Sequence, residues 1–199
     1  MRLKSINRHL KAYSIFQKRK TTINHAFASA IAPFDKYDPV RLTVAMQVLG
    51  QTDIENLRCV YCDEFAETWD HLVGLVRNSE PNGNGHQIGN LIPCCRSCNS
   101  KKGNRDWRLF VKESITDPEK AIKLENKLDS YHRQFSTNVK ISCSRDSSPD
   151  LWRRYSEIKE EVFGLMQEAD QIANKIRSNI TPTNSASNEK LEDNDNCQN

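Results

Sequence analysis

The sequence predicts an α+β protein that is mostly helical, in which N- and C-terminal helices flank a small cysteine-rich core. Apolar residues recur every three to four positions on both sides of residues 57–104, as in amphipathic helices. Residues 57–104 instead concentrate cysteine, histidine, glycine and asparagine. Only 37% of the 199 residues are hydrophobic and the mean hydropathy is −0.73, so the apolar core should be modest.

Four regions follow from these patterns. Residues 1–50 form a basic helical region, 51–112 the core, 113–180 a C-terminal helical region, and 181–199 a tail with the composition of disorder. In the first region we expect helices over 3–20, 22–31 and 40–49, the last one opened by Asp38-Pro39 and ended by Gly50. The apolar positions that predict the first helix are Leu3, Ile6, Leu10, Tyr13 and Phe16.

The later residues favour one strand and then several helices. The stretch 67–73 is rich in strand formers, and 78–89 has the Gly, Pro and Asn content of a loop. We expect a short helix from Cys95 and further helices over 106–114, 117–135 and 148–180. The last helix carries an apolar stripe that either pairs with a second copy, giving a homodimer, or folds back on its own chain.

Composition and charge exclude some classes of protein. No stretch approaches the roughly 18 apolar residues of a membrane span, and the N-terminus lacks the apolar region of a secretory signal, so we expect a cytoplasmic protein without membrane contact. The net charge is only +3, but two segments are strongly basic. They suit a polyanion such as DNA, although solvated helix faces are an equal alternative. The candidate phosphate contacts are Lys18, Arg19, Lys20, Lys101, Lys102, Arg105 and Arg108.

Two Cys-x-x-Cys pairs, Cys59 with Cys62 and Cys95 with Cys98, predict a structural zinc site. Each pair turns two sulfurs toward one ion, and two pairs complete a tetrahedral set of four thiolates. A redox dithiol would account for one pair but not for two matched ones. Cys94 is expected to be a packed thiol, since free cysteine is usually buried.

Between the two cysteine pairs the chain contains WDHL at residues 69–72. The second pair lies within GNLIPCCRSCNSKKG at residues 89–103. The whole string from Cys59 resembles the zinc-bracketed branch of the HNH endonucleases, which share a ββα-metal fold. The resemblance covers about residues 57–104. Many members have a histidine where this chain has Asn99, so it is an H-N-N variant.

The resemblance implies roles for four residues. Asp70 and Asn99 would hold a catalytic cation, His71 would be the general base that activates water, and Asn90 would hold the loop and orient that base. A neutral amide ligand favours Mg²⁺ or Mn²⁺ over softer ions. The implied function is a metal-dependent DNA endonuclease, of the kind used in restriction or defence. The alternative is a zinc module that binds nucleic acid without cutting it.

Overall fold

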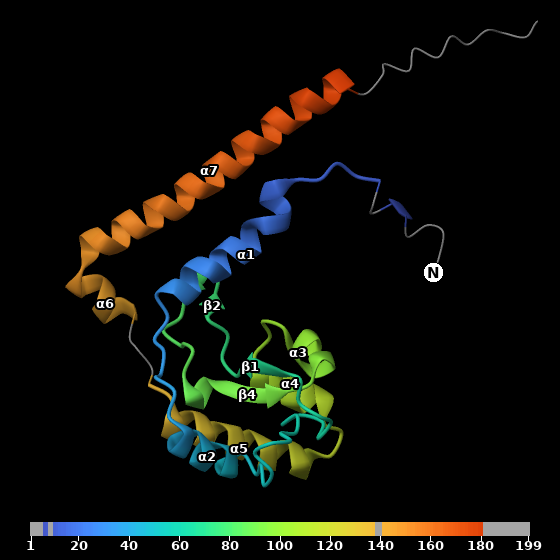
Figure 1. Cartoon of the computed structure of the whole chain (residues 1–199), viewed down its shortest axis with the longest axis vertical. Coiled ribbons are helices and arrows are strands. Elements are labelled where there is room, and N and C mark those ends of the chain that lie inside the picture. The colour runs from blue at the N-terminus through green and yellow to red at the C-terminus, as the bar shows by residue number, and fades with distance from the viewer. Residues whose placement is uncertain (1–5, 8–9, 138–140, 181–199) are drawn as a thin grey trace, which may run out of the picture.

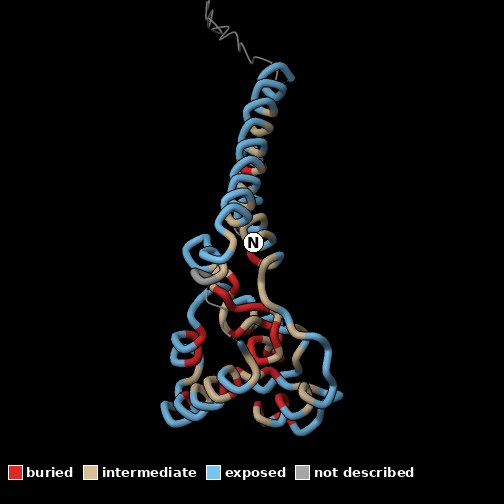
Figure 2. The backbone as a smooth tube through the Cα atoms, turned by 90° about the vertical axis from the view of Figure 1, so that its left-hand side faces the viewer, coloured by how far each residue is buried: buried red, intermediate tan, exposed pale blue. Residues whose placement is uncertain are grey.

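Two parts of different shape make up the computed structural model, which describes residues 6–7, 10–137 and 141–180. A small body holds the strands, and two antiparallel helices, α1 (Ile15–Ala30) and α7 (Pro149–Ile180), project from it (Figure 1). Buried backbone is concentrated in the body, whereas α7 is exposed along most of its length (Figure 2). None of the described helices is long and apolar enough to cross a membrane.

The start of α1 is fastened to α7 by hydrogen bonds and an aromatic contact. The Asp170 carboxylate accepts from Ser14 Oγ at 2.7 Å and from the Ile15 backbone N at 2.6 Å. These bonds lower the pKa of Asp170, so the group stays ionised where it meets the N-terminus of α1. The ring of Phe16 packs edge-on against Phe163, with centroids 5.7 Å apart. The long helix therefore folds back on its own chain over the length of α1.

Three further helices enclose the body. α2 (Pro39–Val48), α4 (Trp107–Ser114) and α5 (Pro118–Phe135) each begin at an aspartate whose side chain accepts backbone N–H bonds, Asp38, Asp106 and Asp117. The larger buried apolar side chains are Met46, Leu49, Leu72, Ile92, Trp107, Phe110, Val111, Leu128 and Tyr131. Because α2 packs on α5 whereas α1 packs on α7, the predicted region 1–50 is shared between the two parts of the molecule.

One antiparallel pair of strands lies at the centre of the body. β1 (Thr68–His71) pairs with β4 (Leu91–Cys94), with Thr68 opposite Cys94 and His71 opposite Leu91. Alternation along β1 places Thr68 and Asp70 on one face and Trp69 and His71 on the other. The face with Thr68 and Asp70 is covered by α3 (Arg96–Lys102). The small α+β core predicted from the sequence is confirmed.

Some boundaries differ from the prediction. One helix, α1, replaces the two expected over 3–20 and 22–31, because Ser14 caps it and no Gly or Pro interrupts residues 15–30. Residues 1–5, 8–9 and 181–199, where part of the first helix and the tail were predicted, lie outside the described residues. The predicted loop 78–89 contributes to the short strand pair β2 (Val76–Arg77) and β3 (Glu80–Pro81) and to the turn η2 (Ile88–Asn90). The helix α6 (Ile141–Ser147) was not predicted.

Candidate active site and metal centre

The two cysteine pairs converge. The Sγ atoms of Cys59, Cys62, Cys95 and Cys98 all lie within 4.8 Å of one another, and those of Cys62 and Cys95 are 3.7 Å apart. Four sulfurs about 2.3 Å from a zinc ion have edges of about 3.8 Å, so the cluster fits one tetrahedral ion. Desolvation raises the pKa of Cys62 and Cys98, and a bound cation would favour the thiolate form of both.

Local structure explains the convergence. The first pair lies on a turn in which the Asp63 N–H donates to the Cys59 carbonyl at 2.9 Å, with Asp63 at a positive φ of 62°. Cys95 caps α3, and its Sγ accepts from the Cys98 N–H at 3.4 Å. Cys94 is fully buried, 3.9 Å from the Cys59 sulfur, and lies outside the group of four. It packs beside the cluster, as the sequence predicted.

Asp70 is held by an ion pair with Lys102. The Lys102 Nζ lies 3.0 Å from Oδ2 and 3.2 Å from Oδ1 of Asp70, and donates to the His71 carbonyl at 2.8 Å. Lys102 is 2% exposed and Asp70 6%. Burial raises the pKa of Asp70, and the ammonium opposes that shift. The prediction that Lys102 contacts DNA phosphates is wrong for this conformation, because its ammonium is buried against β1.

Lys102→Met should destabilise the fold by about 3–5 kcal/mol, since it leaves the Asp70 carboxylate buried without a counter-charge. Urea unfolding of the variant measures this loss. The double variant Asp70→Leu/Lys102→Met removes both charges and should recover most of the stability. If Lys102→Met alone were as stable as the wild type, Lys102 and Asp70 would not form a buried charge pair in solution.

His71 faces away from Lys102 and contacts a second histidine. Its Nε2 lies 3.1 Å from Nδ1 of His86, and no described residue bonds its Nδ1. Burial, followed by the positive fields of His86, Lys102 and His25, lowers the pKa of His71 to about 4. The imidazole is therefore neutral at neutral pH, which is the state that can accept a proton.

Asn90 holds the loop that carries His86. Its side chain is fully buried, accepts from the Val73 N–H at 2.8 Å, and donates to the carbonyls of Val73 and Gly85 at 3.0 Å each. A Cβ at Gly85 would lie 1.8 Å from the Pro33 carbonyl oxygen, so only glycine fits at that position. The loop is thus tied both to the end of β1 and to the segment before α2.

Asn99 lies on the face of α3 that covers β1, and its Nδ2 donates to Thr68 Oγ1 at 3.0 Å. Asp70 and Asn99 offer a carboxylate and an amide oxygen on facing elements, a hard donor set that suits Mg²⁺ or Mn²⁺. Asp70 can receive such an ion only by sharing it with the Lys102 ammonium or by releasing that ammonium. The carboxylate and amide oxygens fit a divalent cation. Any cation bound there must accommodate the Lys102 ammonium next to Asp70.

The remaining predicted DNA contacts differ in exposure and in whether an acidic side chain already pairs with them. Arg105 pairs with Glu113 at 2.6 Å, and Arg108 pairs with Asp129 while stacking on Trp107. Both side chains remain about half exposed, at 48%. The other four are exposed: Lys18, Arg19 and Lys20 on α1, and Lys101 on α3.

Two residues, His86 and Lys102, make contacts at this site that the sequence analysis did not predict. His86 was not assigned to the site from the sequence, and it contacts His71 across a 15-residue separation that no local pattern reveals. Lys102 follows Asn99 by three positions, and that helical spacing places both on the face of α3 toward β1. The spacing was a usable signal for Lys102.

Comparison with known proteins agrees with this geometry. Residues 59–105 match a family model described as HNH endonuclease. Searches of curated proteins and of solved structures gave no significant match. The matched segment begins at Cys59, contains β1, β4 and α3, and ends just after Lys102. Residues 59–105 thus carry an HNH endonuclease domain whose four cysteines are placed to hold one metal ion.

Proposed function

We propose that the chain is a metal-dependent endonuclease that hydrolyses phosphodiester bonds in DNA. The observation that carries this proposal is the neutral, half-buried His71 on β1, with Asp70 and Asn99 on the other side of the strand, inside the HNH domain. A binding module has no need for a neutral imidazole next to a carboxylate at the end of a strand.

We assign the proton of the His71–His86 hydrogen bond to Nε2 of His71, which makes Nδ1 of His71 the base. If His71 Nε2–H donates to His86 Nδ1, the lone pair of His71 lies on Nδ1, where no described residue binds it. That atom takes the proton of the attacking water. Asn90 maintains this arrangement, because its bonds to Val73 and Gly85 fix the loop next to His86.

Asp70 and Asn99 would hold the divalent cation. When bound, that cation would neutralise charge on the phosphate and on the leaving 3′ oxygen. Lys102 supports the site by holding both the Asp70 carboxylate and the His71 carbonyl, which sets the position of β1 relative to α3. Zinc in the thiolate cluster would fix the other end of α3 against the knuckle at Cys59.

One observation favours the alternative, a zinc module that binds nucleic acid without cutting it. Asp70 is neutralised by Lys102, as in a purely structural ion pair. Supercoiled plasmid incubated with the purified chain and Mg²⁺, Mn²⁺ or Zn²⁺ separates the two functions. We expect nicking or linearisation with Mg²⁺ or Mn²⁺, and 5′ phosphate and 3′ hydroxyl ends. No cleavage with any ion would reject the nuclease, and activity with zinc alone would reject the hard-cation assignment.

The exposed basic residues of α1 are proposed to bind the DNA backbone. Lys18, Arg19 and Lys20 form an unopposed positive segment. Changing all three to glutamine should weaken binding and reduce the slope of log affinity against log salt by up to about 3, since each phosphate contact contributes roughly 0.9. Binding titrations at several salt concentrations measure the slope. An unchanged slope would remove α1 from the DNA interface.

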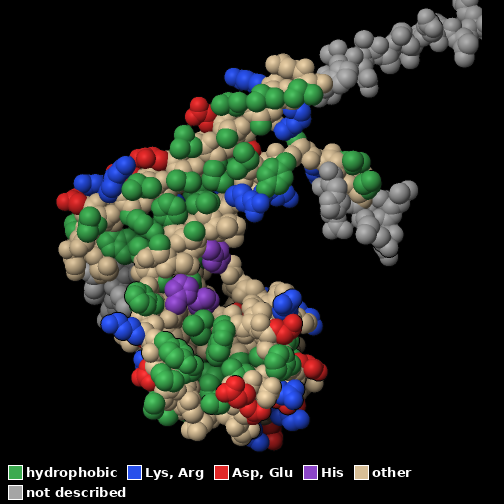
Figure 3. All heavy atoms as spheres, viewed as in Figure 1, with side chains coloured by type: hydrophobic (Ala, Val, Ile, Leu, Met, Phe, Trp, Pro, Cys, Tyr) green, Lys and Arg blue, Asp and Glu red, His purple; other side chains and the backbone are tan. Residues whose placement is uncertain are grey.

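We also propose a role in restriction or defence, carried out by a homodimer. Leu151, Ile158, Leu165 and Ile172 recur every seven residues on α7 and are 38–73% exposed. Hydrophobic side chains are exposed along the helical arm in Figure 3, and these four would form the seam with a second copy. A second site in a dimer would allow both strands to be cut.

A further inference from the structure

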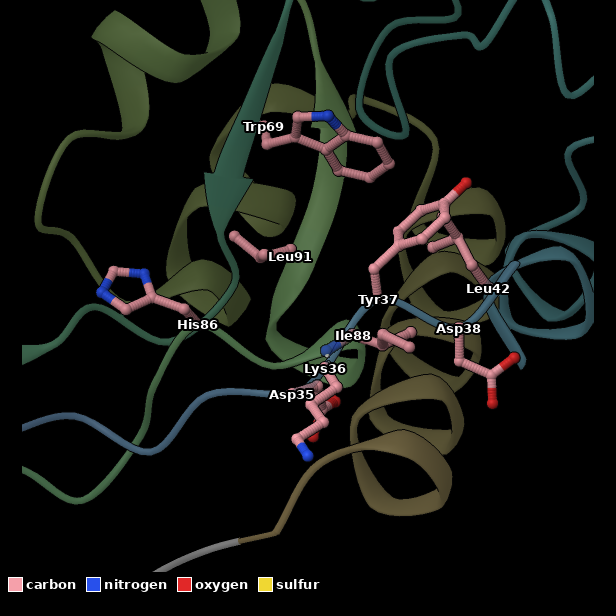
Figure 4. A pocket seen from close by; sticks show the side chains of 9 residues that line it. All are labelled: Asp35, Lys36, Tyr37, Asp38, Leu42, Trp69, His86, Ile88 and Leu91. Carbon is pink, nitrogen blue, oxygen red and sulfur yellow. Dashed lines mark hydrogen bonds between the residues drawn. The ribbon is translucent and has the colours of Figure 1, made fainter. Parts of the chain in front are cut away.

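An open cavity of about 340 Å³ lies beside His71 and has no role in the proposed hydrolysis. Its walls come from β1, from the segment before α2 and from η2 (Figure 4). The volume falls within the roughly 300–1,000 Å³ of small-molecule sites. Its lining includes Tyr37, Asp38, Trp69, His86, Ile88 and Leu91.

Two aromatic rings project into this space without an aromatic partner among the described residues. Trp69 is 46% exposed and Tyr37 82%, and Figure 4 shows both side chains around the same opening, with Leu91 and Ile88 beside them. Large aromatic faces left in water next to an apolar floor indicate a surface that is covered when the protein functions. Rings in such an arrangement suit a flat, aromatic ligand.

The cavity is joined to the candidate base through β1 and His86. Trp69 and His71 lie two residues apart on the same face of β1, about 7 Å along the strand. His86 lines the cavity and also contacts His71 at 3.1 Å. A nucleotide whose phosphate lies at His71 therefore has its own base, or that of its neighbour, within reach of Trp69 and Tyr37.

The polar rim also suits a nucleobase. Asp38 Oδ1 accepts from the Arg41 N–H as the cap of α2, and no described donor binds its Oδ2. A carboxylate oxygen at this position can accept from an exocyclic amino group of a base. Lys36, next along the rim, is exposed and carries the charge that a neighbouring phosphate would need.

We propose that this cavity receives one unstacked base of the substrate strand, stacked against Trp69 and Tyr37. The inference rests on the proposed nuclease function, because the ligand is taken to be part of the nucleic acid that is cut. It makes single-stranded, distorted or locally opened DNA the preferred substrate over a regular duplex, in which every base is stacked and paired.

Binding without added divalent cation tests the cavity separately from cleavage. The probes are single strands about 12 nucleotides long, and the matching duplexes, with 2-aminopurine at successive positions. We expect tighter binding of the single strand, and a fluorescence change confined to one or two positions. Trp69→Ala or Tyr37→Ala should abolish that change and weaken binding by about 5- to 150-fold, the loss expected for one base stacked on an aromatic ring.

Matched variants identify what the cavity binds. Trp69→Phe keeps an aromatic face and should retain most of the affinity. Phe65→Ala removes a 54% exposed ring that does not line the cavity, so it should leave the affinity unchanged.

Equal binding by the wild type and Trp69→Ala, in a chain that still cuts plasmid, would overturn the base site and leave the nuclease standing. Ring-dependent base binding in a chain that never cuts would support the site and reject the nuclease. A loss of self-association on Trp69→Ala, with DNA binding intact, would assign the cavity to a protein partner and also overturn the proposal.

Discussion

Removal of zinc should unfold the body of the protein. Structural zinc contributes about 10–16 kcal/mol of apparent binding free energy in small domains, and a typical domain has only about 5–15 kcal/mol of stability. The ion would join the knuckle at Cys59 and Cys62 to the first turn of α3, and the buried core beside it includes Tyr61 and Phe110, whose rings pack edge-on with centroids 4.9 Å apart. A strong chelator should therefore abolish the thermal transition of this region, as followed by near-ultraviolet circular dichroism.

Two cysteine variants make this prediction specific. Cys98→Ser should lose bound zinc, measured by native mass spectrometry, and should lose the cooperative transition with it. Cys94→Ala removes a buried thiol 3.9 Å from the Cys59 sulfur, yet should retain one zinc per chain. Equal zinc loss in both variants would mean that the ligand set is assigned wrongly, and full stability of Cys98→Ser would rule out a structural ion.

His71→Ala should reduce the rate of plasmid cleavage by about 10²–10⁴-fold, the usual contribution of a general base. The side chain lies at the end of β1 and makes one hydrogen bond, to His86, so its loss should leave the fold and the zinc content unchanged. Single-turnover cleavage with Mg²⁺ measures the chemical step, and native mass spectrometry measures the zinc.

His86→Ala gives the matched comparison. His86 holds the ring of His71 without being assigned to take the proton, so its removal should reduce the rate less than His71→Ala does. Single-turnover rates at saturating protein separate a slower chemical step from any loss of binding at the cavity, which His86 also lines. Cleavage by His71→Ala at the wild-type rate would reject His71 as the base, and a greater loss in His86→Ala would transfer the role to His86.

Helix starts and the cluster of four cysteines were readable from the sequence because they depend on short spacings. Asp38, Asp106 and Asp117 cap helices through bonds to backbone N–H groups two or three residues away. Likewise, two residues between cysteines are enough to turn both sulfurs to one side. The predicted break between helices near residue 20 was wrong, because tertiary packing on α7 supports one continuous helix where no Gly or Pro ends it.

For the candidate catalytic residues, the motif was readable from the sequence, whereas their contacts were not. The order Asp70, His71, Asn90, Asn99 was recognisable as a motif, and alternation along β1 places Asp70 and His71 on opposite faces. What each of them contacts was not recognisable. Burial decided that Lys102 neutralises Asp70 and does not bind phosphate, and folding of the loop after β1 brought His86 to His71.

By itself, then, the sequence determined the helical class and the two matched cysteine pairs, since these follow from spacing and residue type along a few positions, and its resemblance to the HNH endonucleases supplied the candidate catalytic residues. Only the tertiary structure decided the partners of the charged and aromatic side chains. An ion pair between Lys102 and Asp70, or a cavity shared by Tyr37 and Trp69, joins residues about 30 positions apart. Such contacts depend on which surfaces exclude water together, and no local pattern specifies that.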